Sequence, residues 1–248
     1  MNFRTDRQEQ ITQALENPNF TEFQANVKPN LITFGDYGSK KFNIFPTPKI
    51  TANLSTELSK AKIKQARIAE TEKFAHVTYF FNSQNKEKSI FEDHFLIPSS
   101  KVANYKDDPK MQAEKITDKA LEIKDQEYGL IVINYANPDL VGHSGDLTAT
   151  KDGIDCVDFN LKRLIPQYLE KNYTILITAD HGNAEDMEHE ENIPNPSHTS
   201  NDVPLIVLSN QDHTIKSKKD SGLKDIAPTI LKLLDIKIPE SFHGQSLI

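Results

Sequence analysis

Short apolar strands alternate with amphipathic helical stretches along most of this sequence, and this alternation constrains the fold more than any other feature. It predicts an α/β protein with a largely parallel sheet flanked by helices. The predicted strands are Leu31–Phe34, Val77–Phe81, Leu130–Tyr135, Thr174–Thr178 and Leu205–Leu208. The predicted helices lie at about Asp6–Leu15, Leu54–Lys62, Lys110–Ile123, Thr148–Leu169 and Gly222–Leu234.

Residues 36–51 break the alternation, because they contain two prolines and have no hydrophobic periodicity. They predict a linker or a crossing between domains. The piece before them has only about 40 residues, which is too few for a stable domain without help. Either a missing part of the protein packs against this first piece, or the piece lies over the rest of the chain.

Composition excludes several classes of protein. With 37% hydrophobic and 26% charged residues, the chain is neither a disordered acidic protein nor a membrane protein. The net charge of −7 argues against nucleic acid or an anionic membrane as the main partner. The first ten residues contain no apolar stretch of the secretory type, so a cytoplasmic location is expected. Cys156 is the single cysteine and is expected to be a structural thiol.

Three motifs with metal-ligand chemistry stand at the ends of predicted strands. Asp139 and His143 follow one strand and are four residues apart, so a single helical turn could aim both at one point. Asp180 and His181 directly follow the next strand, where Gly182 permits a sharp turn. His198 lies shortly before the strand that begins at Leu205. Each motif alone could equally be a capping or hydrogen-bonding arrangement.

The three motifs together predict a metal centre, because loops at the carboxyl edge of a parallel sheet converge. Carboxylates and neutral imidazoles suit Mn²⁺, Zn²⁺ and similar ions, and five ligands exceed what one four-coordinate site needs. The five predicted ligands are therefore better explained by two metals than by one. A pair of metals is the arrangement typical of phosphoryl transfer. The remaining histidines lack a carboxylate at ligand spacing and are expected to be structural or on the surface: His76, His94, His189, His213 and His243. The acidic run Glu185–Glu191 is expected to be a solvated loop.

The segments ANPDLVGHSG, TADHGNAEDM and HTSNDVP resemble, in order and spacing, the metal motifs of the cofactor-independent (2,3-bisphosphoglycerate-independent) phosphoglycerate mutases of the alkaline phosphatase superfamily. Four further segments carry the resemblance over essentially the whole chain. They are NFRTDR, RIAETEKFAHVTYFFN, GLKDIAPTILKLLDI and the final GQSLI.

The resemblance implies a role for each matching residue. Asp139, His143 and His198 match the ligands of one metal, and Asp180 with His181 match two ligands of a second metal. Arg4 and Arg7 match the arginines that grip phosphoglycerate, a task suited to the planar, permanently charged guanidinium. Lys73 matches the catalytic lysine that reaches the transferring phosphoryl group. The implied metal is Mn²⁺, although Zn²⁺ or Co²⁺ could use the same ligands, and no 2,3-bisphosphoglycerate is required.

The family's reaction converts 3-phosphoglycerate to 2-phosphoglycerate through a metal-activated serine. Family members are about twice as long, and their first segment supplies that serine, an Asp ligand and most of an inserted transferase domain. The resemblance therefore divides this chain into the transferase-domain tail (1–35), a hinge (36–51) and the C-terminal part of the metal-binding phosphatase domain (52–248). Neither Ser144 nor Thr199 sits in the strand-to-helix turn that the nucleophile needs.

Three functional hypotheses stay open at this point. The chain is a mutase part that works with a separate N-terminal chain, a non-catalytic metal-binding remnant, or a phosphohydrolase of the same superfamily. The match of Arg4, Arg7 and Lys73 favours the mutase over the hydrolase. The absence of the serine and of one Asp ligand predicts that this chain alone is inactive.

Overall fold

The computed structural model describes residues 5–23, 29–35, 37–38, 42–45, 50–189, 193–216 and 219–248. The chain divides into two compact units, Met1–Ile50 and Thr51–Ile248. The assignment of the first unit to a transferase domain stays a prediction.

The first unit contains a helix and a two-stranded parallel sheet. Helix α1 covers Thr5–Glu16, and strand β1 (Ile32–Thr33) pairs with β2 (Phe42–Asn43). The helix and the strand near residue 32 are confirmed. The role of residues 36–51 as a hinge stays a prediction, but the sequence did not predict the two residues of strand β2 inside this segment. The sequence could not predict β2, because two residues are too few to show a hydrophobic alternation.

The second unit is built on a parallel three-stranded sheet, which confirms the predicted α/β class. Strand β3 (Gln65–Glu70) lies in the centre, with β4 (Glu92–Ile97) on one side and β5 (Leu130–Ile133) on the other. Two further strands, β6 (Ile175–Thr178) and β9 (Leu205–Leu208), pair antiparallel with each other.

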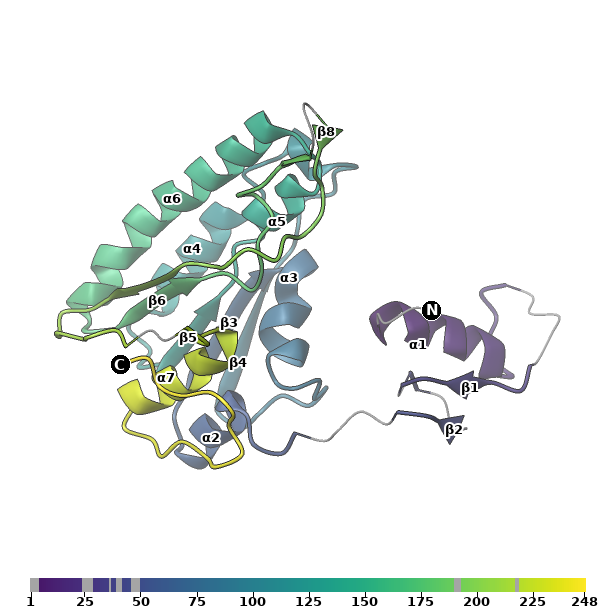
Figure 1. Ribbon diagram of the computed structural model, residues 1–248, viewed down its shortest axis with the longest axis horizontal. Coiled ribbons are helices and arrows are strands. Elements are labelled where there is room, and N and C mark those ends of the chain that lie inside the picture. The colour runs from purple at the N-terminus through teal and green to yellow at the C-terminus, as the bar shows by residue number, and fades with distance from the viewer. Residues whose placement is uncertain are drawn as a thin grey trace. The chain divides into compact units, whose positions relative to one another are not determined.

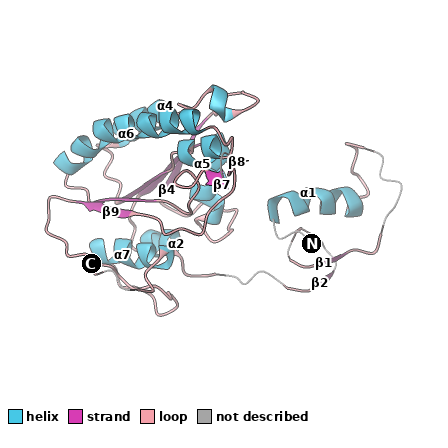
Figure 2. Cartoon of the chain, turned by 45° about the horizontal axis from the view of Figure 1, so that its top comes forward, coloured by secondary structure: helices cyan, strands magenta, loops and turns pink. Residues whose placement is uncertain are grey.

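Helices cover both faces of these strands (Figure 2). On one face, α4 (Ala113–Ile123) and α6 (Leu147–Glu170) lie side by side (Figure 1). Their apolar residues enclose a core with Ala66 and Ile68 of β3. On the other face, α2 (Leu54–Lys60) and α7 (Ile226–Leu233) bury Leu54, Leu58 and Leu231 together. The sheet is therefore the middle of three layers, which leaves its strand ends free to carry a site.

The predicted strand Val77–Phe81 is wrong. Helix α3 (Thr71–Ala75) begins directly after β3 and continues as a π-helical turn, His76–Phe80. The side chain of Thr78 donates a hydrogen bond to the carbonyl of Phe74 (2.7 Å), as a helical hydroxyl does. β-Branched and aromatic residues favour strands only where sheet neighbours are available, and here the preceding helix decides the conformation.

Strands β3 and β4 were not predicted, because their sequences QARIAE and EDHFLI contain polar residues that are buried. Arg67 and Glu92 are completely buried and face each other at 3.4 Å. Ser55 and Asn82 donate hydrogen bonds to Glu92. His94 Nε2 lies 2.5 Å from Glu92 Oε1, a carboxylate contact that the sequence did not predict and that fits the structural role expected for His94. From sequence alone, a strand whose charged residues are buried in a hydrogen-bonded network cannot be distinguished from a polar segment on the surface.

We expect Glu92→Gln to lower the free energy of unfolding by about 3–5 kcal/mol, because it leaves the buried charge of Arg67 without its counter-ion. Urea denaturation of the two proteins measures the difference. Asp158→Asn is the control, since the Asp158–Lys162 pair on α6 is exposed and should leave stability unchanged. Equal stability of Glu92→Gln and the parent would show that Arg67 does not depend on this carboxylate.

Glu92 also predicts the acid behaviour of the fold. Burial alone would raise its pKa, but Arg67, His94, Ser55 and Asn82 together lower the pKa below its ordinary value of 4.5. The folded pKa is thus lower than the unfolded pKa. The stability that Glu92 contributes is present above the unfolded pKa and is lost as pH falls through the folded pKa. In Glu92→Gln this part of the acid destabilisation should be absent.

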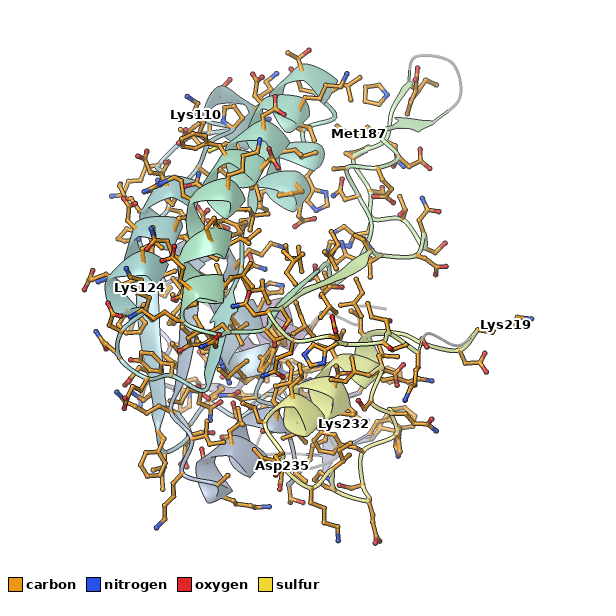
Figure 3. All side chains as sticks on the ribbon, turned by 90° about the vertical axis from the view of Figure 1, so that its left-hand side faces the viewer. Lys110, Lys124, Met187, Lys219, Lys232 and Asp235 are labelled. Atoms are coloured by element: carbon orange, nitrogen blue, oxygen red, sulfur yellow. The ribbon has the colours of Figure 1, made fainter. Side chains whose placement is uncertain are left out.

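The remaining elements are short. They are α5 (Asn137–Gly142), the antiparallel pair β7 (Glu188–His189) and β8 (Ile193–Pro194), and 3₁₀ turns at Tyr105–Asp107 and Leu223–Asp225. The C-terminal segment returns to α7, where Lys232, labelled in Figure 3, donates to the carbonyl of Ile248 (2.5 Å). Among the helices that the structure describes, none combines the length and apolarity needed to cross a bilayer.

Candidate metal centre

Four of the five predicted metal ligands converge at one edge of the second unit. Asp139 lies in the first turn of α5, which is separated from the end of β5 by three residues, and His143 caps the same helix. Pro138 at the helix start fixes this abrupt change of direction. His181 follows β6, and His198 precedes β9. The predicted single helical turn between Asp139 and His143 is confirmed, since the His143 amide donates to the Asp139 carbonyl (3.0 Å).

Asp139, His143 and His198 present three donor atoms to one point. Nε2 of His143 lies 3.1 Å from Oδ1 of Asp139, and Nε2 of His198 lies 3.2 Å from the same oxygen. The two Nε2 atoms are 3.1 Å apart. Donors that share one metal at about 2.0–2.2 Å lie roughly 3 Å from each other, so this triangle has the size of a coordination face.

The imidazole of His143 is held in the form that binds metal. Its Nδ1 is 2.5 Å from the carbonyl oxygen of Pro196. A carbonyl can only accept, so Nδ1 carries the proton and, in the neutral ring, Nε2 presents its lone pair to the donor triangle. The same contact ties α5 to the loop before β9, which holds His198.

His198 is also disposed to be neutral. Partial burial lowers its pKa, and the neighbouring His181 lowers the pKa further. The rings of His181 and His198 stack at 3.7 Å between centroids. The lowered pKa favours the neutral imidazole of His198, which is the form that binds metal.

Asp139 is the common neighbour of the whole cluster. Burial would raise its pKa, but Lys73, His143 and Asn183 outweigh burial and lower the pKa below its ordinary value. Lys73 donates to Oδ2 of Asp139 (2.5 Å), and Asn183 donates to Oδ1 (3.1 Å). Lys73 is buried near the start of α3. The carboxylate therefore stays charged and lies between a lysine ammonium and the imidazoles.

Asp180 and His181 form a second, more open pair beside the triangle. His181 Nε2 is 4.0 Å from Asp139 Oδ1 and 3.6 Å from Asp180 Oδ2. The side chain of Asp180 is 58% exposed, whereas that of Asp139 is 15% exposed. Donor atoms of Asp139, His181 and His198 all lie within 4.8 Å of one another. The described residues thus fit one metal on three donors, with two more donors next to it.

Two supporting residues were not singled out from the sequence. Asn183 is buried and contacts Asp139, and Glu185 accepts from the Asn183 amide (2.6 Å), the Asn201 side chain (3.0 Å) and the Thr199 hydroxyl. Glu185 therefore links the loop after β6 to the loop before β9. Glu185 is exposed, as expected for a solvated loop, and it makes these hydrogen bonds at the surface. In the sequence, only the position of Glu185 a few residues after Asp180 and His181 could have pointed to a role at the site.

Glycine lets these loops approach each other closely. A Cβ on Gly182 would overlap Thr199 and Glu185, and a Cβ on Gly142 would overlap Asn183. The amide of Thr199 donates to the carbonyl of Gly182 (2.9 Å), which closes the two loops against each other. Both glycines permit close backbone approach next to the ligands.

The remaining candidate residues are placed as follows. Arg4 lies outside the described residues, and Arg7 lies in α1 with its side chain outside them. Ser144 donates to the carbonyl of Val141 (2.6 Å), and the Thr199 hydroxyl is occupied by Glu185. The expectation that neither hydroxyl is the nucleophile stays a prediction. The charges of the site also act on His76. Burial and Lys73 lower the pKa of His76 below its ordinary value, and the opposing effects of Asp180 and Asp139 are smaller.

We expect His143→Ala to weaken divalent-metal binding at least about tenfold, because the triangle loses one of its three donors. Titration calorimetry with Mn²⁺, Zn²⁺ and Co²⁺ measures affinity and stoichiometry. His243→Ala is the matched control, since His243 is exposed and far along the chain from the motifs. An unchanged affinity for all three ions would remove His143 from the ligand set.

A family model described as the Metalloenzyme superfamily matches residues 5–238. The chain is 44% identical over 255 residues to a 2,3-bisphosphoglycerate-independent phosphoglycerate mutase of Coxiella burnetii (strain RSA 493 / Nine Mile phase I). It is 41% identical over 254 residues to the enzyme of that name from Clostridium botulinum (strain Langeland / NCTC 10281 / Type F). Both matches cover 100% of this chain and 49% of the relative.

A crystal structure of Leishmania mexicana phosphoglycerate mutase at low cobalt concentration has a similar fold, with a TM-score of 0.87 and 31% sequence identity. The match covers 99% of this chain and 49% of that chain. This chain therefore spans about half the length of the proteins that it matches.

Proposed function

The chain belongs to the metalloenzyme superfamily, and we propose that it is the C-terminal portion of a 2,3-bisphosphoglycerate-independent phosphoglycerate mutase. The observation that supports this most is the donor triangle of Asp139, His143 and His198 with the Lys73 ammonium bound to the same carboxylate. The mutases match this chain over its whole length, and the match covers 49% of their own length.

The chemistry follows from the residues. Asp139, His143 and His198 hold one divalent ion, and Asp180 with His181 hold part of a second. Bound metal lowers the pKa of a coordinated hydroxyl nucleophile and neutralises charge on the phosphoryl oxygens. Mn²⁺ is the proposed ion, and Zn²⁺ or Co²⁺ can use the same nitrogen and oxygen donors.

Lys73 adds a fixed positive charge at the same place. Its Nζ lies 2.5 Å from Asp139, inside a buried environment where Coulomb interactions are strong. We assign it the catalytic role of stabilising the transferring phosphoryl group. Arg4 and Arg7 are proposed to grip the carboxylate and phosphate of phosphoglycerate, which a guanidinium binds through two parallel hydrogen bonds.

The proposed reaction is the conversion of 3-phosphoglycerate to 2-phosphoglycerate without added 2,3-bisphosphoglycerate. In the family that the chain resembles, the reaction requires a serine nucleophile and a further Asp ligand from the N-terminal portion, and we propose the same requirement here. The test is this conversion by the two portions together, with and without divalent metal. Release of inorganic phosphate in place of 2-phosphoglycerate would favour a phosphohydrolase, and metal binding with neither product would favour a remnant.

A further inference from the structure

His76 carries an exposed imidazole that makes no hydrogen bond to any residue that the structure describes. The ring lies against Phe80, with 5.4 Å between the ring centroids and 49° between the ring planes. A neutral imidazole has one N–H donor and one lone pair. The ring of His76 therefore keeps its hydrogen-bonding capacity for another molecule.

The position of His76 on its helix brings the ring next to Lys73. His76 ends α3, and its amide donates to the carbonyl of Lys73. Side chains three residues apart are neighbours on a helix surface, with about 5–6 Å between their Cβ atoms. The Lys73 ammonium is fixed on Oδ2 of Asp139 (2.5 Å). His76 thus projects beside the cation to which the proposed function gives the transferring phosphoryl group.

A π-helical turn fixes the backbone of His76. The turn covers His76–Phe80, and its residues Val77 and Thr78 are buried. The hydroxyl of Thr78 donates to the carbonyl of Phe74 (2.7 Å), which ties the turn to α3. π-Helical turns are rare and are frequently found at functional sites. This turn holds an exposed ring with a free donor in a defined place.

The charges that act on His76 come from two segments that carry metal ligands. Desolvation and Lys73 lower the pKa of His76, and Asp180 and Asp139 act in the opposite direction. Asp139 belongs to α5, whereas Asp180 follows β6. Charge interactions near a protein surface are screened within about 10 Å. The ring of His76 therefore lies close to both segments.

Several donors at the centre are already engaged. Nδ1 of His143 donates to a backbone carbonyl, and the side-chain amide of Asn183 donates to Asp139. Lys73 uses one of its N–H groups on the same carboxylate. A phosphoryl group presents three strongly accepting oxygens, so it takes hydrogen bonds from several donors at once. The N–H of His76 is an uncommitted donor beside Lys73.

We propose that His76 is a substrate-contacting residue whose ring N–H donates to an oxygen of the phosphoryl group, beside the ammonium of Lys73. The ligand class is a phosphate monoester, and inorganic phosphate presents the same oxygens. The proposal rests on the proposed function and adds a residue to it. His76 acts here on the phosphoryl group and not as a metal ligand, since the clustered donor atoms are those of Asp139, His181 and His198.

Binding of inorganic phosphate to the full chain loaded with Mn²⁺ tests the contact. Relaxation of the phosphorus NMR signal by the bound Mn²⁺ reports the dissociation constant. His76→Ala should weaken phosphate binding at least about tenfold, because a hydrogen bond to a charged acceptor is lost. The affinity for Mn²⁺ should stay at the parent value. His243→Ala, which removes another exposed histidine, is the control and should match the parent in both measurements.

Two further variants separate the contact from a structural role. His76→Asn and His76→Gln carry an amide N–H near the positions of Nδ1 and Nε2, respectively. One of the two should bind phosphate nearly as tightly as the parent protein. Failure of both variants to restore binding would overturn the hydrogen bond to phosphate.

Other outcomes would also overturn the proposal. An equal loss of Mn²⁺ affinity and phosphate affinity in His76→Ala would make His76 a metal ligand. Unchanged phosphate affinity in that variant, or no phosphate binding by the parent chain loaded with Mn²⁺, would remove His76 from the phosphoryl site.

Turnover separates this contact from the proposed function. In a complex with the unmatched half of the Coxiella burnetii mutase, His76→Ala should lower kcat/KM for 3-phosphoglycerate at least about tenfold. Mutase turnover with parental kcat and KM would overturn the contact and leave the function standing. Phosphate binding that depends on His76, in a complex without mutase turnover, would support the contact and count against the function.

Discussion

Divalent-metal binding is expected to fall at least about 100-fold in Asp139→Asn, measured as the dissociation constant for Mn²⁺ by titration calorimetry. Loss of a residue that merely orients a ligand costs about 10–100-fold, so loss of a direct, shared ligand should cost more. Oδ1 of Asp139 lies within 3.2 Å of both His143 and His198, and asparagine cannot supply its negative charge.

Asp139→Asn should also change the protein without metal. Lys73 would keep its buried position and lose its only described carboxylate partner, which is costly in a buried site. The variant should therefore unfold at lower urea concentration than the parent. Asp158→Asn, an exposed aspartate on α6, is the control and should match the parent in both measurements. An unchanged Mn²⁺ affinity in Asp139→Asn would place the metal elsewhere.

The sequence was informative wherever chemistry depends on spacing. Asp139 and His143 are four residues apart on one helical turn, and the structure places both beside His198, as their positions at strand ends predict. Strands such as β5, β6 and β9 were predicted because their apolar runs are unbroken.

The sequence was uninformative wherever burial depends on distant partners. β3 contains Arg67 and Glu70, which look like surface residues until Glu92 and Ser99 are brought to them by the fold. Val77–Phe81 has strand-forming residues, yet it continues a helix. The hydrogen bond between Lys73 and Asp139 spans 66 residues and was not predicted, although the family resemblance had singled out both residues.

The proposed function includes the expectation that this chain has no mutase activity by itself. Its donor triangle can hold a metal, but phosphoryl transfer through a covalent intermediate also needs a nucleophile that the metal can activate. Ser144 and Thr199, the hydroxyls nearest the ligands in sequence, already donate to Val141 and Glu185. In the proposed function, the nucleophile comes from the half of the mutases that this chain does not match.

The central claim is that this chain is one portion of a metal-dependent mutase whose site is completed by another portion. The most direct measurement is the rate of 2-phosphoglycerate formation from 3-phosphoglycerate, with Mn²⁺ and without 2,3-bisphosphoglycerate. We expect no turnover above background from the purified 248-residue chain, and metal-dependent turnover when it is co-expressed with the unmatched half of the Coxiella burnetii mutase. The same complex made with Asp139→Asn should be inactive. Robust turnover by the 248-residue chain alone would contradict the account.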